Sequence, residues 1–396
     1  MSVKRLPDQP TERERFLKTA GYYAAFIVLG LASAAIGPTL PGLAEQTGSQ
    51  LSQISFLFTT HALGYMIGSF QGGRVYDRLP GHQLMVFGLV LIALTLVAAP
   101  IVPMLWLLTL VIGLLGLAQG LVDVGGNTLL VWVHGERVGP FMNGLHFFYG
   151  LGGFVLPIIV AWMVSLNGDI TWAYWTLALL SLPAVVWLVR LSSPPAPRTS
   201  SAESADPVNP WLIPLIALFF TLYVGAETSL GGWIHTYTVA SGLGNAAVGA
   251  YLTSGFWGAF TAGRLLSIPL AARHRPRSLL LIDFAGAVAS LGVLLLWPAS
   301  TVAAWVGTVG VGASIASIFP TMISLAERRL EITGRVTGWF FVGASVGGMS
   351  LPWLIGQLFE SIGPRVTMVI ILIDLLVAAG ILAVLALIPA RVGERA

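Results

Sequence analysis

The sequence contains twelve apolar runs, each of the length that a membrane-spanning helix requires, roughly 20 residues. A bilayer supplies no partners for backbone N–H and C=O groups, so runs of this length predict helices. A transmembrane barrel would instead show alternation over shorter segments. We therefore predict an all-α integral membrane protein with twelve transmembrane helices, at 17–40, 51–77, 83–102, 104–133, 139–166, 170–191, 210–238, 246–272, 277–297, 300–326, 333–360 and 364–389.

The amino-acid composition limits the classes of function that the protein can have. Of the 396 residues, 56% are hydrophobic and only 9% are charged, whereas a soluble domain carries about 25% charge. No phosphate-binding loop, zinc-type ligand spacing or Ser/His/Asp set is present, and cysteine is absent. We expect a monomer in a lipid bilayer that takes a small molecule, with no enzymatic activity, no cofactor and no nucleic-acid partner.

The positive charges predict the orientation. With twelve spans and the N-terminus in the cytoplasm, nineteen of the twenty Lys and Arg residues lie on the cytoplasmic side, Arg264 among them, and only Arg365 lies outside. Positive residues favour cytoplasmic loops, so both termini are predicted to be cytoplasmic, within segments 1–16 and 390–396. The short loops are consistent with a bacterial inner (plasma) membrane.

The chain divides into two related halves. Residues 192–209 are rich in Pro and Ser and predict a cytoplasmic linker between six-helix bundles at 17–191 and 210–389. The halves repeat weakly at an offset near 190 residues, for example Gly68-Ser-Phe70 through Arg74 against Gly258-Ala-Phe260 through Arg264. Two parallel repeats of this kind hold their substrate near the midplane, between the halves.

Asp123 lies deep in the run 104–133, and no Lys or Arg follows it until Arg137. An acid at this depth is costly and indicates a functional site. Gln119, Asp123 and Asn127 are spaced four residues apart and share one helix face. We predict that they form a cation-coupling site, with Asp123 and Asn127 as Na⁺ ligands. The alternative is a protonated carboxyl bonded to a neighbouring helix.

Three more acids lie within the predicted spans, and no Lys or Arg lies at a similar depth. Such an acid must be protonated, hydrogen-bonded, hydrated or paired with a transported cation. Glu227 is the candidate for substrate binding, with a structural hydrogen bond as the alternative. Asp283 is expected to pair with an arginine of a loop, and Asp374 to be structural.

Further substrate-binding candidates accompany Glu227. Asn143 and His146 lie on one face of the run 139–166 with Tyr149 beside them, although glycines there also favour close helix packing. Gly231-Gly232 is expected to break its helix and to let Trp233 lie flat against a sugar ring. Trp257 is a weaker candidate. Prolines predict two further interruptions, at 37–41 and at Pro320.

The loop between 51–77 and 83–102 contains Gly73, Asp77 and Arg78. This arrangement resembles the loop signature of the major facilitator superfamily, in which it acts in gating. A solvated turn with cytoplasmic positive charge is the alternative interpretation. The resemblance implies that superfamily's fold, with two pseudo-symmetric six-helix halves.

Longer motifs resemble one family within it. Asp123-Val-Gly-Gly-Asn127, Leu145 through Pro157 and Tyr223 through Trp233 are similar to the sodium-dependent glucose transporter family, itself similar to fucose permeases. The resemblance implies cation-coupled uptake of a hexose by alternating access. It places Asp123 and Asn127 near the coupling site, and His146, Glu227 and Trp233 near the sugar.

We therefore predict symport of a monosaccharide such as glucose, with Na⁺ favoured over H⁺ as the co-transported ion. Two alternatives remain open: a proton-coupled exporter of drugs or amphipathic molecules, and a sugar sensor that does not transport.

Overall fold

The computed structural model describes residues 11–76, 78–195, 211–271, 273–330 and 334–388, and all regular structure in these ranges is helical. The first half contains α1 (Glu12–Ser33), α2 (Ile36–Thr47), α3 (Leu51–Ile54), α4 (Phe56–Tyr76), α5 (Gly81–Ala98), α6 (Leu105–His134), α7 (Gly139–Asn167) and α8 (Thr171–Val189). The second half contains α9 (Leu212–Ala240), α10 (Ala246–Ala271), α11 (Pro276–Leu296), α12 (Thr301–Ile315), α13 (Ile318–Glu327), α14 (Gly334–Ile362) and α15 (Val366–Leu387). The short 3₁₀ helices η1 (Ala99–Ile101) and η2 (Gly135–Arg137) follow α5 and α6.

These helices correspond to the twelve predicted spans, because α1 with α2, α3 with α4, and α12 with α13 each succeed one another across a short break. Ten of the described helical segments are long and apolar enough to cross a membrane. The remaining two, α4 and α10, are more polar, and both contribute to the central cavity described below. The helix α1 begins at Glu12, earlier than the predicted residue 17, because Thr11 and Glu14 form a capping box.

The interruption predicted at Pro320 is confirmed, since α12 and α13 are separated just before this residue. The interruption predicted at 37–41 lies earlier, at Ala34-Ala35, because residues 37–41 are helical within α2. The expected break at Gly231-Gly232 was wrong, since α9 is continuous through both glycines. A Cβ on Gly232 would lie 2.8 Å from the Phe58 ring, so this glycine serves close packing between the halves.

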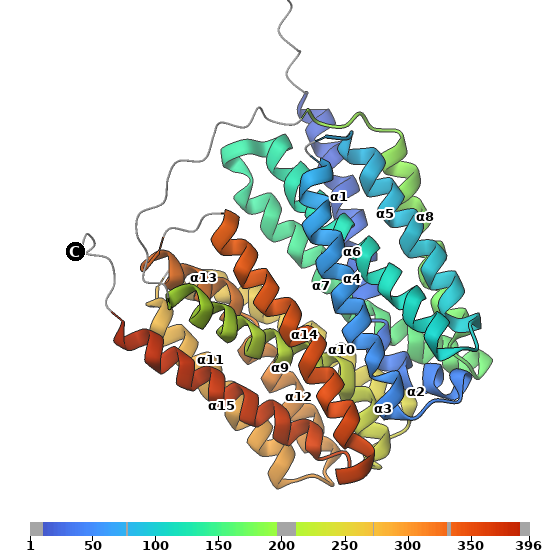
Figure 1. The fold of residues 1–396 in the computed structure, drawn as a ribbon, viewed down its shortest axis with the longest axis vertical. Helices are drawn as coiled ribbons and strands as arrows, with labels where there is room; N and C mark the ends of the chain where they lie inside the picture. Colours follow the sequence, from blue (N-terminus) through green and yellow to red (C-terminus); the bar gives the residue numbers. More distant parts are fainter. Residues whose placement is uncertain (1–10, 77, 196–210, 272, 331–333, 389–396) are drawn as a thin grey trace, which may run out of the picture.

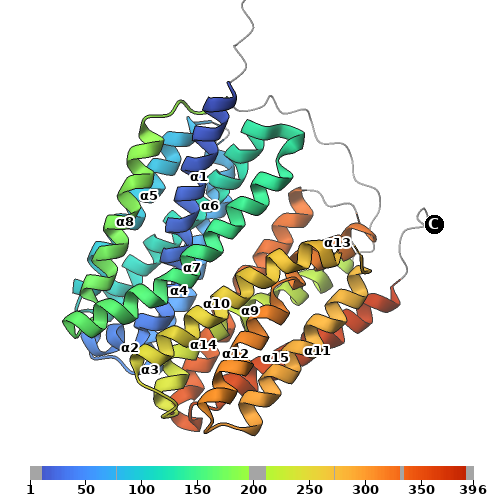
Figure 2. The same cartoon turned by 180° about the vertical axis from the view of Figure 1, so that it is seen from behind.

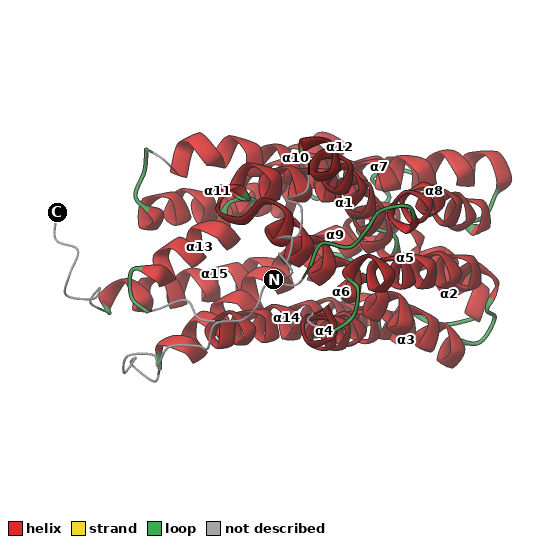
Figure 3. Cartoon of the chain, turned by 90° about the horizontal axis from the view of Figure 1, so that it is seen from above, coloured by secondary structure: helices red, strands yellow, loops and turns green. Residues whose placement is uncertain are grey.

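The two bundles are splayed at one end and joined at the other. Figure 1 shows α1–α8, in blue to green, beside α9–α15, in yellow to red, with the gap between them widest near the N-terminal end of α1. Seen from behind, α7 and α10 lie side by side across the bundle boundary (Figure 2). The view along the bundles shows α4 next to α14 at the same boundary (Figure 3).

Equivalent glycines bring equivalent helices together in the two halves. A Cβ on Gly152 of α7 would lie 2.3 Å from the carbonyl oxygen of Ile27 in α1. A Cβ on Gly347 of α14 would lie 1.9 Å from the carbonyl oxygen of Thr221 in α9. Small residues that allow helix backbones to approach are characteristic of membrane interiors. The repeat detected in the sequence is therefore also a repeat of packing.

Hydrogen bonds between the halves close the end opposite to the N-terminus. The backbone N–H of Leu51 donates to Glu360 Oε1 at 2.9 Å, and Gln357 Nε2 donates to the carbonyl oxygen of Ser52 at 2.7 Å. These bonds join α3 to α14. The structure therefore shows one conformation, in which the two bundles are in contact at one end and apart at the other.

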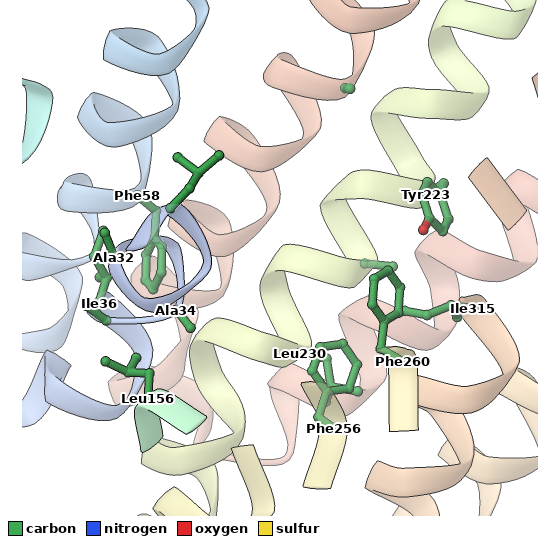
Figure 4. Packing of buried hydrophobic residues seen from close by; sticks show 14 of the residues in the cluster. Ala32, Ala34, Ile36, Phe58, Leu156, Tyr223, Leu230, Phe256, Phe260 and Ile315 are labelled. Atoms are coloured by element: carbon green, nitrogen blue, oxygen red, sulfur yellow. The ribbon is translucent and has the colours of Figure 1, made fainter. Parts of the chain in front are cut away.

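Aromatic side chains fill the core on both sides of the boundary. Figure 4 shows Phe58 beside Ala34 and Ile36, and Phe256 and Phe260 beside Leu230. The Phe256 and Phe260 rings are stacked, with centroids 6.1 Å apart and an interplanar angle of 25°. This packing makes α10 a stiff support for the residues that it presents to the centre.

Candidate functional site

A cavity of about 890 Å³ lies between the two halves. Its inner part is lined by residues such as Ala34, Phe58 and Trp257, and its lining extends to His274 and Arg328 at the splayed end. Both deep acids singled out in the sequence, Asp123 and Glu227, line this cavity.

Asp123 is held by donors from two helices. The hydroxyl of Tyr65, on α4, donates to Asp123 Oδ2. Asn127 Nδ2, one turn further along α6, donates to Asp123 Oδ1 at 3.0 Å and to the backbone oxygen of Asp123 at 2.9 Å. Among the described residues, no Lys or Arg forms an ion pair with Asp123. The carboxylate is therefore hydrogen-bonded by neutral groups only.

The predicted row of three polar residues is divided between two networks. Gln119 Oε1 accepts from His61 Nε2 at 2.8 Å and from Ser33 Oγ at 3.2 Å. Gln119 Nε2 is buried without a partner. Gln119 thus belongs to a network nearer the closed end, and Asn127 is the residue that contacts Asp123.

Glu227 lies on α9 in the opposite wall, and its electrostatic neighbour is Arg264 of α10. The Tyr223 hydroxyl lies near both groups but makes no hydrogen bond of regular geometry. Among the described residues, Glu227 and Arg264 do not form an ion pair with each other. The expectation that no arginine reaches the depth of Glu227 was wrong: Arg264 is inside α10 and lines the cavity.

The helix α7 presents its three predicted residues to the same cavity. Asn143, His146 and Tyr149 all contribute to its lining, and the His146 ring meets Phe26 edge to face at 6.0 Å. Tyr149 is an electrostatic neighbour of Asp123 in one wall and of Glu227 in the other. Tyr149 therefore links the two acid-bearing regions.

The two tryptophans differ in position. Trp257 lines the cavity, and its buried Nε1 has no hydrogen-bond partner. Trp233, in contrast, is 0% exposed, donates from Nε1 to the carbonyl oxygen of Pro352 at 3.0 Å and stacks on Phe359. The expectation that Trp233 faces a sugar was wrong for this conformation, because Trp233 does not line the cavity and packs against Phe58 of the first half and Phe359 of the second.

Gly73 and Arg78 of the loop motif do not line the cavity. Gly73 is near the end of α4, in a place where a Cβ would meet nothing within 4 Å, and Arg78 is exposed in the turn that follows. Asp77, the acid of the motif, lies outside the described residues. The gating role of Gly73, Asp77 and Arg78 stays a prediction.

Within the described ranges, no three His, Asp or Glu side chains gather into a metal-binding cluster. Asp123 and Asn127 carry oxygen atoms, which suit a hard cation. However, the Asn127 amide points its nitrogen at Asp123. A cation held by both residues requires that amide to rotate so that its oxygen faces the carboxylate.

The sequence did not reveal two members of this site, Tyr65 and Arg264. Tyr65 lies on α4, far from Asp123 in sequence, and only the pairing of α4 with α6 brings their side chains together. Arg264 looked like one of many arginines on the cytoplasmic side. The signal available in the sequence was that Arg264 lies within the predicted span 246–272 and not in a loop.

Two helical bundles around a cavity with acids on its walls and one end closed are the architecture of a membrane transporter. The chain belongs to the Major Facilitator Superfamily, whose model matches residues 22–352. The resemblance drawn from the sequence is confirmed at this level, and the chain is a multi-pass membrane transporter and not an enzyme.

Relatives and solved structures agree with that assignment. The chain is 31% identical over 375 residues to sodium-dependent glucose transporter 1A of Mus musculus, covering 85% of this chain and 88% of that protein. It is 32% identical over 360 residues to sodium-dependent glucose transporter 1 of Xenopus laevis, covering 83% and 73%. Its fold is similar to that of a D-xylose-proton symporter, with a TM-score of 0.76, 12% identity and coverage of 96% and 99%.

Proposed function

We propose that the protein couples the entry of a cation to the transport of a monosaccharide such as glucose, with Na⁺ favoured over H⁺. The observation that carries the proposal is Asp123, an acid on the cavity wall that has neutral donors and, within the described residues, no positive partner. A buried charge of this kind gains most from a bound cation. The names of the relatives support both the ion and the sugar.

The proposed sugar site lies beside the proposed cation site. Asn143, His146, Tyr149 and Trp257 supply polar and aromatic groups to the cavity that Glu227 also lines. Carboxylate and amide groups suit the hydroxyls of a sugar, and an indole offers an apolar face. Because Tyr149 lies near both acids, occupancy of one site changes the surroundings of the other.

The helix α4 connects the proposed cation site to the closed end. It contributes Tyr65 to Asp123, and its Thr59 hydroxyl donates to the carbonyl oxygen of Met349 in α14 at 3.1 Å. A cation that replaces Tyr65 at Asp123 releases the Tyr65 side chain of α4 from α6, while the close glycine contacts between the two helices remain. We propose that this release favours opening of the contact between α4 and α14, which is the alternating-access step.

We further propose a bacterial inner membrane with both termini cytoplasmic, as the distribution of positive residues favours. The splayed end holds the N-terminal end of α1, so this orientation makes the present conformation inward-facing. A monomer suffices, because the cavity is built within one chain.

The proton is the second candidate for the co-transported ion. It is favoured by the geometry at Asp123, where each carboxylate oxygen accepts one hydrogen bond and no metal-binding cluster of acids or histidines is found among the described residues. A carboxylate has a free lone pair on each oxygen beside these bonds, so it can take up a proton where it stands, whereas Na⁺ requires a new set of oxygen ligands.

Equilibrium binding tests the proposal without a gradient. Labelled glucose is titrated onto the purified protein at constant ionic strength, with Na⁺ or with choline, at two pH values. Linkage requires that Na⁺ raise glucose affinity by the same factor by which glucose raises Na⁺ affinity. Glucose binding that is insensitive to both Na⁺ and pH contradicts cation coupling.

A further inference from the structure

We propose that Arg264 is a substrate-binding residue that determines specificity: its guanidinium and the Glu227 carboxylate together hold two adjacent hydroxyl groups of a neutral sugar. The inference rests on the proposed sugar transport and deepens it by assigning a donor to the site. It concerns a residue that the sequence repeat contains but that the proposed cation site does not require.

Arg264 is held in place but its donors are free. Its guanidinium carbon lies 4.4 Å from the centroid of the Phe260 ring, one turn earlier on α10. Stacking on an aromatic face fixes the guanidinium plane and leaves its N–H edge available. Arg264 Nε is enclosed by protein and has no hydrogen-bond partner among the described residues, so the outer nitrogens of the guanidinium are the donors that can reach the cavity that this side chain lines. Unpartnered donors beside a substrate cavity indicate an acceptor on the substrate.

The first half of the chain contains the same stacked pair in a different place. In the repeat, Arg74 corresponds to Arg264 and Phe70 to Phe260, and Arg74 lies 4.3 Å from the Phe70 ring centroid. Arg74, however, is exposed and does not line the cavity. The stacked geometry is therefore common to both halves, whereas access to the cavity belongs to the second half alone. A role in packing alone would apply to both stacked pairs and does not explain why only Arg264 lines the cavity.

Glu227 and Arg264 are neighbours without being an ion pair. Arg264 is an electrostatic neighbour of Glu227, yet the two form no ion pair within the described residues. An acceptor and a donor thus stand side by side on one wall. A sugar hydroxyl both donates and accepts, so one hydroxyl can donate to Glu227 while its neighbour accepts from Arg264. A substrate carboxylate fits less well, because Glu227 would repel it.

Arg264 also faces α7. It is an electrostatic neighbour of His146 and of Tyr149, both of which line the cavity. A sugar held by Arg264 and Glu227 therefore lies against the first half as well as the second. Binding at this place bridges the two bundles, as a transported substrate must.

The experiment is a double-mutant cycle between protein and ligand. Binding of glucose and of each monodeoxyglucose is measured on detergent-purified wild-type protein, Arg264→Ala, Arg264→Lys and Arg74→Ala. The last variant removes the equivalent stacked arginine away from the cavity. Size-exclusion profiles and thermal unfolding confirm that each variant is folded, and Arg264→Lys retains the charge if Arg264→Ala does not fold.

The proposal predicts a specific pattern. Wild-type protein loses affinity for deoxyglucoses modified at two adjacent positions. Arg264→Ala weakens glucose binding by about tenfold or more, and it no longer distinguishes glucose from the analogue that lacks the hydroxyl bound by Arg264. Arg264→Lys shows the same loss of discrimination, because lysine lacks the planar fork. Arg74→Ala binds all ligands as the wild type does.

Three results overturn the inference. If Arg264→Ala binds glucose and the analogues as the wild type does, Arg264 is not a binding residue, and the proposed sugar transport is unaffected. If the wild type binds none of the sugars, the proposed function fails together with the inference. If glucuronate competes better than glucose in the wild type but not in Arg264→Ala, the arginine binds a carboxylate and not a diol.

Discussion

Replacing Asp123 with asparagine removes the charge at the proposed coupling site and nearly preserves its shape. In the structure the carboxylate accepts from Tyr65 and from Asn127. The asparagine oxygen can still accept from Tyr65, while its amide nitrogen then faces Asn127 Nδ2. One hydrogen bond is lost, a net contribution of about 1 kcal/mol. Asn127 keeps its bond to the backbone oxygen of residue 123, at 2.9 Å in the wild type. The variant is therefore expected to fold.

The transport effect is expected to be much larger than the effect on folding. With one Na⁺ per sugar, a tenfold inward Na⁺ gradient supplies about 1.4 kcal/mol and supports about tenfold accumulation of sugar. Asp123→Asn has no charge to hold the cation, so the accumulation ratio should fall to about 1 while exchange of labelled for unlabelled sugar continues. Both quantities are measured in the same preparation of proteoliposomes.

Asp283→Asn is the matched control. Asp283 is a buried acid on α11 that accepts from the Ser317 hydroxyl, and it does not line the cavity. The same chemical change at this position should leave the accumulation ratio unchanged. Tenfold accumulation by Asp123→Asn, or equal losses in the two variants, would refute the assignment of Asp123.

Three further predictions address the sugar site, the packing and the conformation. Glu227→Gln should raise the half-saturation concentration about 5- to 150-fold, the range for about 1–3 kcal/mol, and an unchanged uptake curve would make Glu227 structural. Gly30→Ala should lower the free energy of unfolding by about 1–3 kcal/mol, because its Cβ would meet the Tyr149 carbonyl. Gly292→Ala, whose Cβ enters open space, should leave it unchanged. Equal melting temperatures for the two variants would contradict this prediction. Ser324→Cys, on the cavity of a chain without cysteine, should react with an impermeant maleimide from the side of the N-terminus alone, and labelling from the opposite side would contradict the closed end.

Much of the architecture follows from local patterns. Apolar run length and proline positions predict the spans and, within a few residues, two of their interruptions, because both act within one helix. The contact between Asn127 and Asp123 was predictable for the same reason, since residues four apart on a helix are neighbours. The glycine repeat further indicated which helices correspond in the two halves.

Contacts between helices were not predictable in this way. Tyr65 reaches Asp123 because α4 and α6 are rotated toward each other, and a single sequence does not contain that rotation. Trp233 is buried at the boundary between the bundles, against Phe58 and Phe359, because α9 does not break at its glycines. Arg264 was assigned to the cytoplasmic side by its charge, although the splayed bundles place it on the cavity wall beside Glu227.

Uptake of labelled glucose into proteoliposomes is the most direct measurement of coupled transport. The wild-type protein is given an inward Na⁺ gradient at equal pH, and then a proton gradient without Na⁺. Accumulation above the external concentration under Na⁺ is the predicted result, and accumulation under protons alone would assign Asp123 to proton coupling. Equilibration without accumulation under both gradients would contradict the account of Asp123 as a coupling site.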